Sequence, residues 1–262
     1  MFRKKSDRHS PLKYRPLRQA GQSIDEEIEA FYDDKIATLM VMAGFVVAVA
    51  VMDWFRWLTH TPTMPVLSTI AAVLFAIYAA VRVIPRWKKL RELKQARDGE
   101  KIIAEHLDAL REKGYRVLHD VVYQRPDGKA YNIDHVLIGG TGIFTIETKT
   151  ISKPTGESEV TYDGEQVLVQ GLEPDRDPII QAKAEAQWVR DFVKSCIGKD
   201  GVPVRPVVLF PGWYTSKQPK GVEVWVLNEK ALPVFVQNER GFVTQQDIYA
   251  IHFHLSQYVR RR

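Results

Sequence analysis

The chain has 262 residues, of which 45% are hydrophobic and 26% are charged, a composition typical of globular proteins with one large or two small domains. Its one cysteine, Cys196, excludes an intrachain disulfide and a cysteine-based zinc cluster. The net charge of +5 indicates nucleic-acid binding only weakly, because the basic residues gather beside two apolar runs.

The first 34 residues are predicted to form a basic arm and a short acidic helix. Residues 1–21 contain two prolines and seven basic side chains, which is typical of a disordered segment on a membrane surface or on nucleic acid, with lipid the favoured partner. Ser23 followed by Glu26 is a capping-box pattern, so a helix is predicted over residues 24–34.

Two apolar runs then predict membrane-spanning helices. Residues 36–52 and 64–81 carry no charged side chain, and each run is close to the roughly 20 apolar residues that cross a bilayer. Trp54 and Trp57 lie between them and fit an interfacial aromatic belt. Buried helices of a soluble protein are the alternative for such runs. The predicted spans are residues 36–58 and 64–84, approximately, with a short external loop.

Basic residues decide the predicted orientation. Seven lie within residues 1–21, before the first span, and seven follow the second span within residues 82–97. The loop 53–63 holds only two basic residues, Arg56 and His60. By the positive-inside rule, both termini and the following domain face the cytoplasm. We therefore expect a multi-pass protein, in the inner membrane if bacterial, with anionic lipid at its basic juxtamembrane segments.

A basic juxtamembrane helix is predicted over residues 86–97, and a folded domain over residues 98–262. The domain begins with a helix from Asp98 or Gly99 to Lys113, because apolar residues recur there at helical spacing after an interruption at Gly99.

Two acids of this helix are candidates to face a site. Glu100 and Glu105 are five residues apart, so they point roughly 140° away from each other. Only one can face a site at the start of the helix, and we expect it to be Glu100. An acid also stabilises a helix N-terminus for electrostatic reasons alone.

A strand at residues 115–123 leads through a turn at Asp127 and Gly128 to a hairpin whose strands are residues 131–138 and 143–149. Its turn is rich in glycine, which tolerates the backbone of tight turns. If Gly140 and Thr141 are the central residues, paired residue numbers sum to 281. Asp134 then faces Glu147, and Asn132 faces Lys149.

Period-two alternation divides this hairpin into a polar and an apolar face. The polar face holds Asn132, Asp134, Glu147 and Lys149, and the core face holds Ile133, Leu137, Phe144 and Ile146. Opposed carboxylates repel unless a cation lies between them, and oxygen ligands suit Mg²⁺, with Mn²⁺ as a substitute. The lysine could orient or deprotonate water, so the pattern is suited to phosphodiester hydrolysis. A solvated hairpin face can carry the same residues.

The remaining elements predict a mixed α/β sheet with helices on both faces. They are a hairpin of residues 159–162 and 166–169 around Asp163 and Gly164, a helix of residues 179–195 opened by Pro178, strands of residues 204–210 and 222–227, and a helix of residues 245–260.

Four separated blocks resemble the nuclease-related domain, or NERD, over roughly residues 98–200. The blocks are Asp98-Gly99-Glu100, Asn132-Ile133-Asp134-His135, Gly142-Ile143-Phe144 leading into Ile146-Glu147-Thr148-Lys149, and Pro178 with Gln181. This family is similar to the PD-(D/E)xK nucleases, so the resemblance implies a restriction-endonuclease-like mixed sheet flanked by helices, here preceded by a transmembrane helical hairpin.

The resemblance also implies roles for individual residues. Asp134 and Glu147 would be metal ligands, and Lys149 would be the catalytic lysine. Glu100 would support the metal or its water, and Gln181 would contact the site. Isoleucine precedes Asp134 where the superfamily name has proline. His135 accompanies the acid, but alternation points it to the opposite face, so it is not in the catalytic set.

The leading hypothesis is a membrane-anchored, Mg²⁺-dependent nuclease acting on cytoplasmic DNA, with RNA not excluded as a substrate. The alternative is an inactive nuclease-like scaffold that binds DNA or a partner protein at the membrane. Scattered lysines rather than a dense basic patch favour the alternative. The sequence does not define the oligomeric state.

Overall fold

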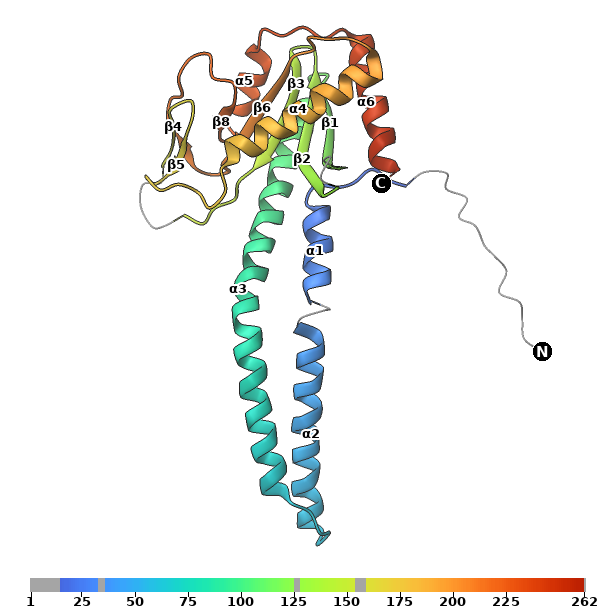
Figure 1. Ribbon diagram of the computed structural model, residues 1–262, viewed down its shortest axis with the longest axis vertical. Coiled ribbons are helices and arrows are strands. Elements are labelled where there is room, and N and C mark those ends of the chain that lie inside the picture. The colour runs from blue at the N-terminus through green and yellow to red at the C-terminus, as the bar shows by residue number, and fades with distance from the viewer. Residues whose placement is uncertain (1–14, 33–35, 125–127, 154–158, 262) are drawn as a thin grey trace, which may run out of the picture. The chain divides into compact units, whose positions relative to one another are not determined.

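The structure is a computed structural model that describes residues 15–32, 36–124, 128–153 and 159–261. It divides into two compact units (Figure 1). The sheet unit contains residues up to Gln22 together with Gly99–Arg262, and the helical unit contains Ser23–Asp98.

The helical unit holds most of α1 (Gln22–Tyr32), all of α2 (Thr38–Leu58) and the first part of α3 (Pro65–Arg111). The helix predicted after Ser23 is present, and its predicted end at residues 33–34 lies outside the described residues. Both α2 and α3 contain a stretch long and apolar enough to cross a membrane, judged by length and composition. Only 6% of this stretch is buried in α2 and 11% in α3.

The predicted interruption of the helix at Gly99 is wrong, because α3 runs unbroken through that residue. A Cβ built on Gly99 would lie 1.8 Å from Oγ1 of Thr150. The glycine therefore permits a close approach between α3 and the chain at Thr150, and it does not end the helix.

The main sheet is mixed, as predicted. Its strand order is β1-β2-β3-β6-β8, in which β1, β2 and β3 pair antiparallel while β6 is parallel to β3 and to β8. The strands are β1 (Arg116–Gln124), β2 (Ala130–Gly139), β3 (Gly142–Thr148), β6 (Val204–Leu209) and β8 (Trp225–Leu227). The turn predicted at Asp127 lies outside the described residues.

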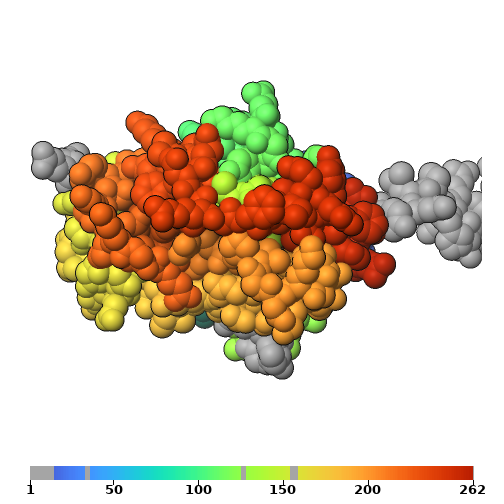
Figure 2. Space-filling model, turned by 90° about the horizontal axis from the view of Figure 1, so that it is seen from above, coloured from blue at the N-terminus to red at the C-terminus, as the bar shows by residue number. Residues whose placement is uncertain are grey.

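The two-residue turn between β2 and β3 is confirmed. Gly139 pairs with Gly142, and the register continues with paired numbers that sum to 281 as far as His135 and Ile146. Backbone N of Val243 donates to O of Gly140 over 2.9 Å, so chain between the last two helices covers the turn. In Figure 2, red and orange C-terminal segments leave the yellow-green sheet residues visible only in a narrow gap.

Three further helices complete the sheet unit: α4 (Pro178–Ile197), α5 (Leu232–Asn238) and α6 (Gln245–Arg260). The predicted helices at residues 179–195 and 245–260 correspond to α4 and α6, whereas α5 was not predicted. The predicted hairpin around Asp163 is confirmed as β4 (Glu159–Tyr162) and β5 (Val167–Val169), and a short β7 (Tyr214–Thr215) pairs with β4.

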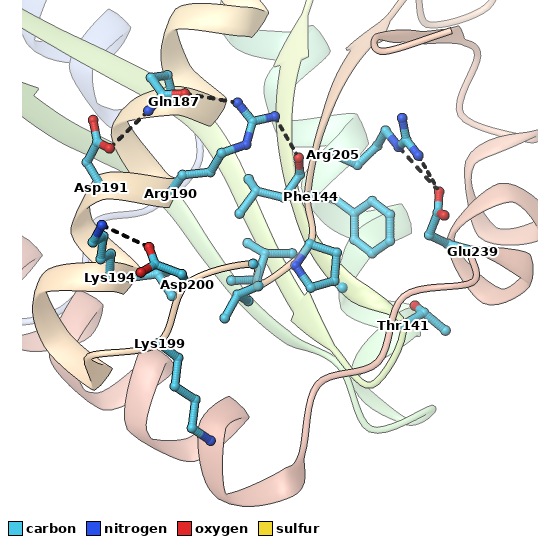
Figure 3. A pocket seen from close by; sticks show the side chains of 17 residues that line it. Thr141, Phe144, Gln187, Arg190, Asp191, Lys194, Lys199, Asp200, Arg205 and Glu239 are labelled. Atoms are coloured by element: carbon cyan, nitrogen blue, oxygen red, sulfur yellow. Dashed lines mark hydrogen bonds and ion pairs between the residues drawn. The ribbon is translucent and has the colours of Figure 1, made fainter. Parts of the chain in front are cut away.

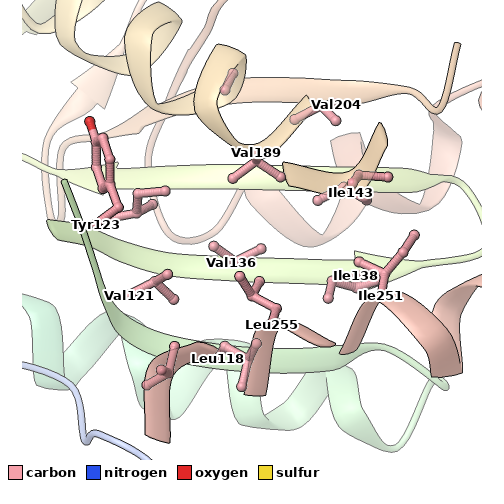
Figure 4. Close-up of a cluster of buried hydrophobic side chains, with 14 of the residues drawn as sticks. Leu118, Val121, Tyr123, Val136, Ile138, Ile143, Val189, Val204, Ile251 and Leu255 are labelled. Atoms are coloured by element: carbon pink, nitrogen blue, oxygen red, sulfur yellow. The ribbon is translucent and has the colours of Figure 1, made fainter. Parts of the chain in front are cut away.

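Helices cover both faces of the main sheet. On one face α4 and α6 contribute Val189, Ile251 and Leu255 to a cluster with residues of β1, β2 and β3 (Figure 4). On the other face α3 and α5 contribute Leu107 and Val236 to a second cluster. Both faces of the hairpin are therefore core.

The predicted alternation fails in the middle of β2. Ile133 packs in the same cluster as Val136 and Ile138, whereas Leu137 packs in the cluster on the opposite face. Opposite this point in β1, Asp120 has φ of 50°, a left-handed conformation that is costly for a residue other than glycine. The side chains of both strands therefore switch to the other face of the sheet at Asp120 and Asp134. For this reason the alternation with a period of two does not hold across these two residues.

The N-terminal arm differs in part from the predicted disordered segment. Residues 1–14 lie outside the described residues, but residues 15–22 belong to the sheet unit. Ala20 is buried, and Leu17 packs against the cluster of α4 and α6. This stretch, residues 15–22, is called the N-terminal segment below.

Candidate active site

Asp134 and Glu147 lie at the end of the β2–β3 hairpin that is distant from the turn. Each is 5% exposed. Continuing the register would place Asp134 opposite Glu147, but the ladder ends one pair earlier, at His135 and Ile146. Oδ2 of Asp134 instead accepts a 2.7 Å hydrogen bond from backbone N of Thr148. The aspartate thus holds the end of β3 through its side chain.

The predicted pairing of Asn132 with Lys149 is not formed. Asn132 donates from Nδ2 to Asp120 over 3.2 Å, toward β1. Backbone N of Lys149 donates to O of Leu209 over 2.8 Å, because β3 continues its parallel pairing with β6 there.

Lys149 joins β3 to α4 by side-chain hydrogen bonds. Its Nζ lies 2.6 Å from Oε1 of Glu147 and 2.9 Å from Oε1 of Gln181. Gln181 is in the first turn of α4, a helix capped by Asp177, whose side chain accepts from backbone N of Ile179, and opened by a proline. The structure therefore brings the predicted residues Glu147, Lys149 and Gln181 together.

Glu185 is a further acidic residue at this place, and the sequence analysis missed it. It is 1% exposed, and its Oε1 accepts a 2.9 Å hydrogen bond from Nε2 of Gln181. Its position one helical turn after Gln181 puts both residues on the same face of α4. That spacing was the available signal, because a glutamate facing the core needs a polar partner.

Glu100 is the helix glutamate that is buried, with 5% exposed, whereas Glu105 is exposed. Oε2 of Glu100 accepts a 3.0 Å hydrogen bond from backbone N of Gly21. The negative charge of Glu100 is among the causes that raise the pKa of Asp134. Glu100 therefore lies close enough to Asp134 to act on it electrostatically.

Burial and mutual repulsion shift the protonation of these groups. Burial, followed by the charge of Glu147, raises the pKa of Asp134 well above its ordinary value, and the same two causes raise the pKa of Glu185. Burial alone would lower the pKa of Lys149, but Glu147 and its other acidic neighbours outweigh burial and raise it. Lys149 is consequently a protonated cation among carboxyl groups.

The residues present fit a hard divalent cation by donor chemistry. Oε2 of Glu147 and Oε2 of Glu185 are buried and accept no hydrogen bond from a donor group, and a buried carboxylate oxygen without a donor is costly. The two glutamates lie close enough to share a proton, which is one of the causes that raise the pKa of Glu185. In the described part of the chain, no three His, Cys, Asp or Glu side chains are arranged to hold one ion. Mg²⁺ is commonly held by one or two carboxylates and keeps several waters, so two protein ligands suffice.

His135, which is not among the predicted catalytic residues, makes its side-chain contact with β1. It is fully buried, and its Nδ1 is 2.9 Å from Nδ1 of His119 in β1. Burial, then the neighbouring His119, lowers the pKa of His135 well below its ordinary value. The pair is a neutral contact inside the sheet unit.

A separate pocket of about 540 Å³ lies at the opposite end of β3, beside Thr141 and Gly142 (Figure 3). Its basic side chains are engaged within the protein. Lys194 pairs with Asp200 at 2.9 Å, and Arg205 pairs with Glu239 at 3.2 Å. The pocket is distinct from the cluster of Glu147 and Lys149, because neither of these residues lines it.

Comparison with known proteins places this cluster in a defined class of domain. Residues 95–211 match the family model described as nuclease-related domain, NERD. The matched range includes Glu100, Asp134, Glu147, Lys149, Gln181 and Glu185. The resemblance stated from the sequence is confirmed at the level of this domain.

An uncharacterized protein of Bacillus anthracis is 37% identical over 79 residues. The alignment covers 30% of this chain and 34% of the relative, so the chain spans about a third of the length of the curated relative that it matches.

Proposed function

We propose that the protein is a metal-dependent nuclease that hydrolyses phosphodiester bonds of DNA from an anchored position at a membrane. The observation that carries the proposal is the contact of Lys149 with Glu147 inside a nuclease-related domain, beside a buried and unpartnered Glu147 oxygen. Metal-dependent phosphodiester hydrolysis uses a carboxylate that can bind a cation and a lysine that can contact water or phosphate. Both groups are present here in one buried place.

Asp134 and Glu147 would hold the divalent cation. When bound, such a cation stabilises charge on a phosphoryl oxygen and lowers the pKa of a water molecule. Glu147 has one oxygen on Lys149 and the other unpaired, so it can bind the cation without losing its lysine contact.

Lys149 would orient water or a phosphate oxygen by donating a hydrogen bond. The sequence left open whether this lysine orients or deprotonates water. Its raised pKa favours the protonated form, which has no free electron pair for proton abstraction. Gln181 accepts from Nζ of Lys149 and thereby fixes the direction of the ammonium group.

The membrane anchor is proposed from the two apolar helices. A soluble core helix of this composition would be mostly buried, whereas large side chains of α2 and α3 are exposed, including Phe45 at 70% and Leu74 at 63%. Burial of these side chains in lipid removes that exposed apolar surface from water. With the basic flanks inside, the nuclease domain faces the cytoplasm, where DNA is the proposed substrate.

The test uses the full-length protein in detergent with supercoiled plasmid DNA, with Mg²⁺ or with EDTA. Wild type should nick or linearise the plasmid only with Mg²⁺, and Glu147→Ala or Lys149→Ala should abolish cleavage. Glu112→Ala and Lys220→Ala are matched controls, because both side chains are exposed, and both should cut normally. Equal cutting by the site variants and wild type would refute the assignment.

The same assay separates the scaffold alternative. A scaffold would retain DNA without cutting it, its binding would not require Mg²⁺, and its affinity would fall steeply with salt. Several cations outside the site are already paired with acids, such as Lys183 with Glu223 at 3.1 Å. This pairing weakens the case for a charge-driven DNA-binding surface.

A further inference from the structure

The N-terminal segment, residues 15–22, contacts the sheet unit beside the candidate site. Together with Arg18 and Ala20, residues of α3 and β1 such as Lys101 and His119 line a hollow of about 490 Å³. This segment ends at the first residue of α1 and precedes α2 in the chain, whereas every residue of the candidate site follows both helices. The sheet unit is thus assembled from chain on both sides of the apolar helices.

Arg18 reaches a wholly buried acid. Its Nε lies 2.5 Å from Oδ2 of Asp120, which has an exposed fraction of 0%. Oδ1 of the same carboxylate accepts from Nδ2 of Asn132 over 3.2 Å. A buried carboxylate that loses a cationic partner is strongly destabilising, so Arg18 stabilises this arrangement of β1 and β2.

Asp120 occupies the place where the two strands change face. It lies between the pairs His119–His135 and Val121–Ile133, at the level of Asp134 in the neighbouring strand. Its left-handed φ of 50° is retained only if the surroundings hold it. The ion pair with Arg18 and the hydrogen bond from Asn132 supply that restraint beside Asp134.

Gly21 makes the second link to the site. Its backbone N donates to Oε2 of Glu100 over 3.0 Å, in a buried contact. The φ of 73° at this residue is favourable for glycine and strained for other residues. Hydrogen bonds to a charged carboxylate are stronger than neutral ones, so the N-terminal segment fixes the position of Glu100.

We propose that two groups of the N-terminal segment, the side chain of Arg18 and the backbone of Gly21, position residues of the active site, and that Arg18 is a positioning residue. Arg18 acts through Asp120 on Asp134, and the backbone of Gly21 acts on Glu100. This inference rests on the proposed nuclease function. Arg18 does not serve as a phosphate contact here, because its guanidinium is engaged with Asp120 and its side chain is only 17% exposed.

The experiment compares full-length wild type, Arg18→Ala, Arg18→Lys and Gln19→Ala in detergent. Gln19 is the neighbouring control because its side chain is exposed. Three quantities are measured: hydrogen exchange of peptides covering residues 130–136, the dissociation constant of Mn²⁺, and kcat and KM for plasmid cleavage.

Arg18→Ala should speed exchange at residues 130–136, weaken Mn²⁺ binding and lower kcat by about 10-fold each, the loss typical of groups that orient metal ligands. KM for DNA should change little, because Arg18 does not contact the substrate. Arg18→Lys, which retains the charge, should recover most of the loss, and Gln19→Ala should match wild type.

Unchanged exchange and Mn²⁺ affinity in Arg18→Ala would overturn the proposal, as would a rise in KM with kcat unchanged. A peptide from α6 reports global folding. If Arg18→Ala also speeds hydrogen exchange in that peptide, the variant is unfolded, and the test then rests on whether Arg18→Lys keeps the exchange rate and the Mn²⁺ affinity of wild type. If wild type cuts no DNA, the proposed function fails, while hydrogen exchange still shows whether Arg18 orders the strand at Asp134.

Discussion

Hydrogen bonds link Lys149 to two acids. Glu147 contacts its ammonium group directly, and Gln181 relays the contact to Glu185. An amide can perform this relay because its oxygen accepts from the lysine while its nitrogen donates to the glutamate. Replacing Gln181 by a carboxylate would add charge and remove the donor, which explains why an amide suits this position.

Glu185 should make the metal-free protein sensitive to pH. Its folded-state pKa is raised above the ordinary 4.5, chiefly by burial and then by Glu147. The folded state therefore holds the proton more tightly than the unfolded state, so stability is greatest at low pH and is lost as pH rises through the folded-state pKa. Glu185→Gln removes this dependence.

The check is the melting temperature of wild type and Glu185→Gln in EDTA. The two should be similar near about pH 4, below the unfolded-state pKa, and the variant should become progressively more stable toward about pH 8. A difference that does not grow with pH would contradict the burial of an ionisable Glu185.

The sequence was sufficient to predict the turn at Gly140 and Thr141. It also favoured Glu100 over Glu105 as the acid that faces inward, and Glu100 is the buried one of the two. The sequence did not predict the backbone at Asp120, because no sequence pattern indicates a left-handed residue in the middle of a strand. That residue changes the face of the sheet on which Ile133 packs. Glu185 was missed because a glutamate in a helix is usually on the solvent side.

At the scale of elements, α3 meets the chain just after β3 at Gly99. Gly99→Ala should destabilise the sheet unit, because the added Cβ would overlap Oγ1 of Thr150 at 1.8 Å. Overpacking of this kind costs about 1–3 kcal/mol, partly offset by the better helix propensity of alanine, about 1 kcal/mol.

The measurement is thermal or denaturant unfolding of full-length variants. Each kcal/mol lost should lower the melting temperature by roughly 2–4 °C in a domain of this size. Gly140→Ala is the control, because nothing lies within 4 Å of a Cβ built there. The double variant Gly99→Ala with Thr150→Gly should recover stability, and failure to recover it would contradict the proposed contact.

The elements themselves were largely predictable. The mixed sheet, the hairpin of β4 and β5, and the bounds of α6 were predicted from alternation, turn residues and helical periodicity. The docking of residues 15–22 was not predictable, since seven basic side chains and two prolines within residues 1–21 are typical of a disordered arm. Tertiary contacts, among them those with Asp120 and Glu100, order this segment.

At the scale of the whole molecule, the proposed membrane anchor makes a prediction about the side on which the sheet unit lies. The positive-inside rule predicts that Thr61, in the loop between the apolar helices, is outside, while Cys196 is inside. In intact cells, a membrane-impermeant maleimide should label Thr61→Cys in a Cys196→Ser background and should not label wild type. Labelling after permeabilisation shows whether Cys196 can react with the maleimide at all. Labelling of wild type but not of Thr61→Cys in intact cells would show the opposite orientation.

Above all, we propose that Asp134 and Glu147 share a divalent cation beside Lys149. The most direct measurement is the anomalous scattering of Mn²⁺ in a crystal of the protein. We expect a single anomalous peak within coordinating distance of both carboxylates, about 2.0–2.3 Å for a small hard cation, with Lys149 still in contact with the site. A peak elsewhere, or no peak at a Mn²⁺ concentration that supports cleavage, would contradict the claim.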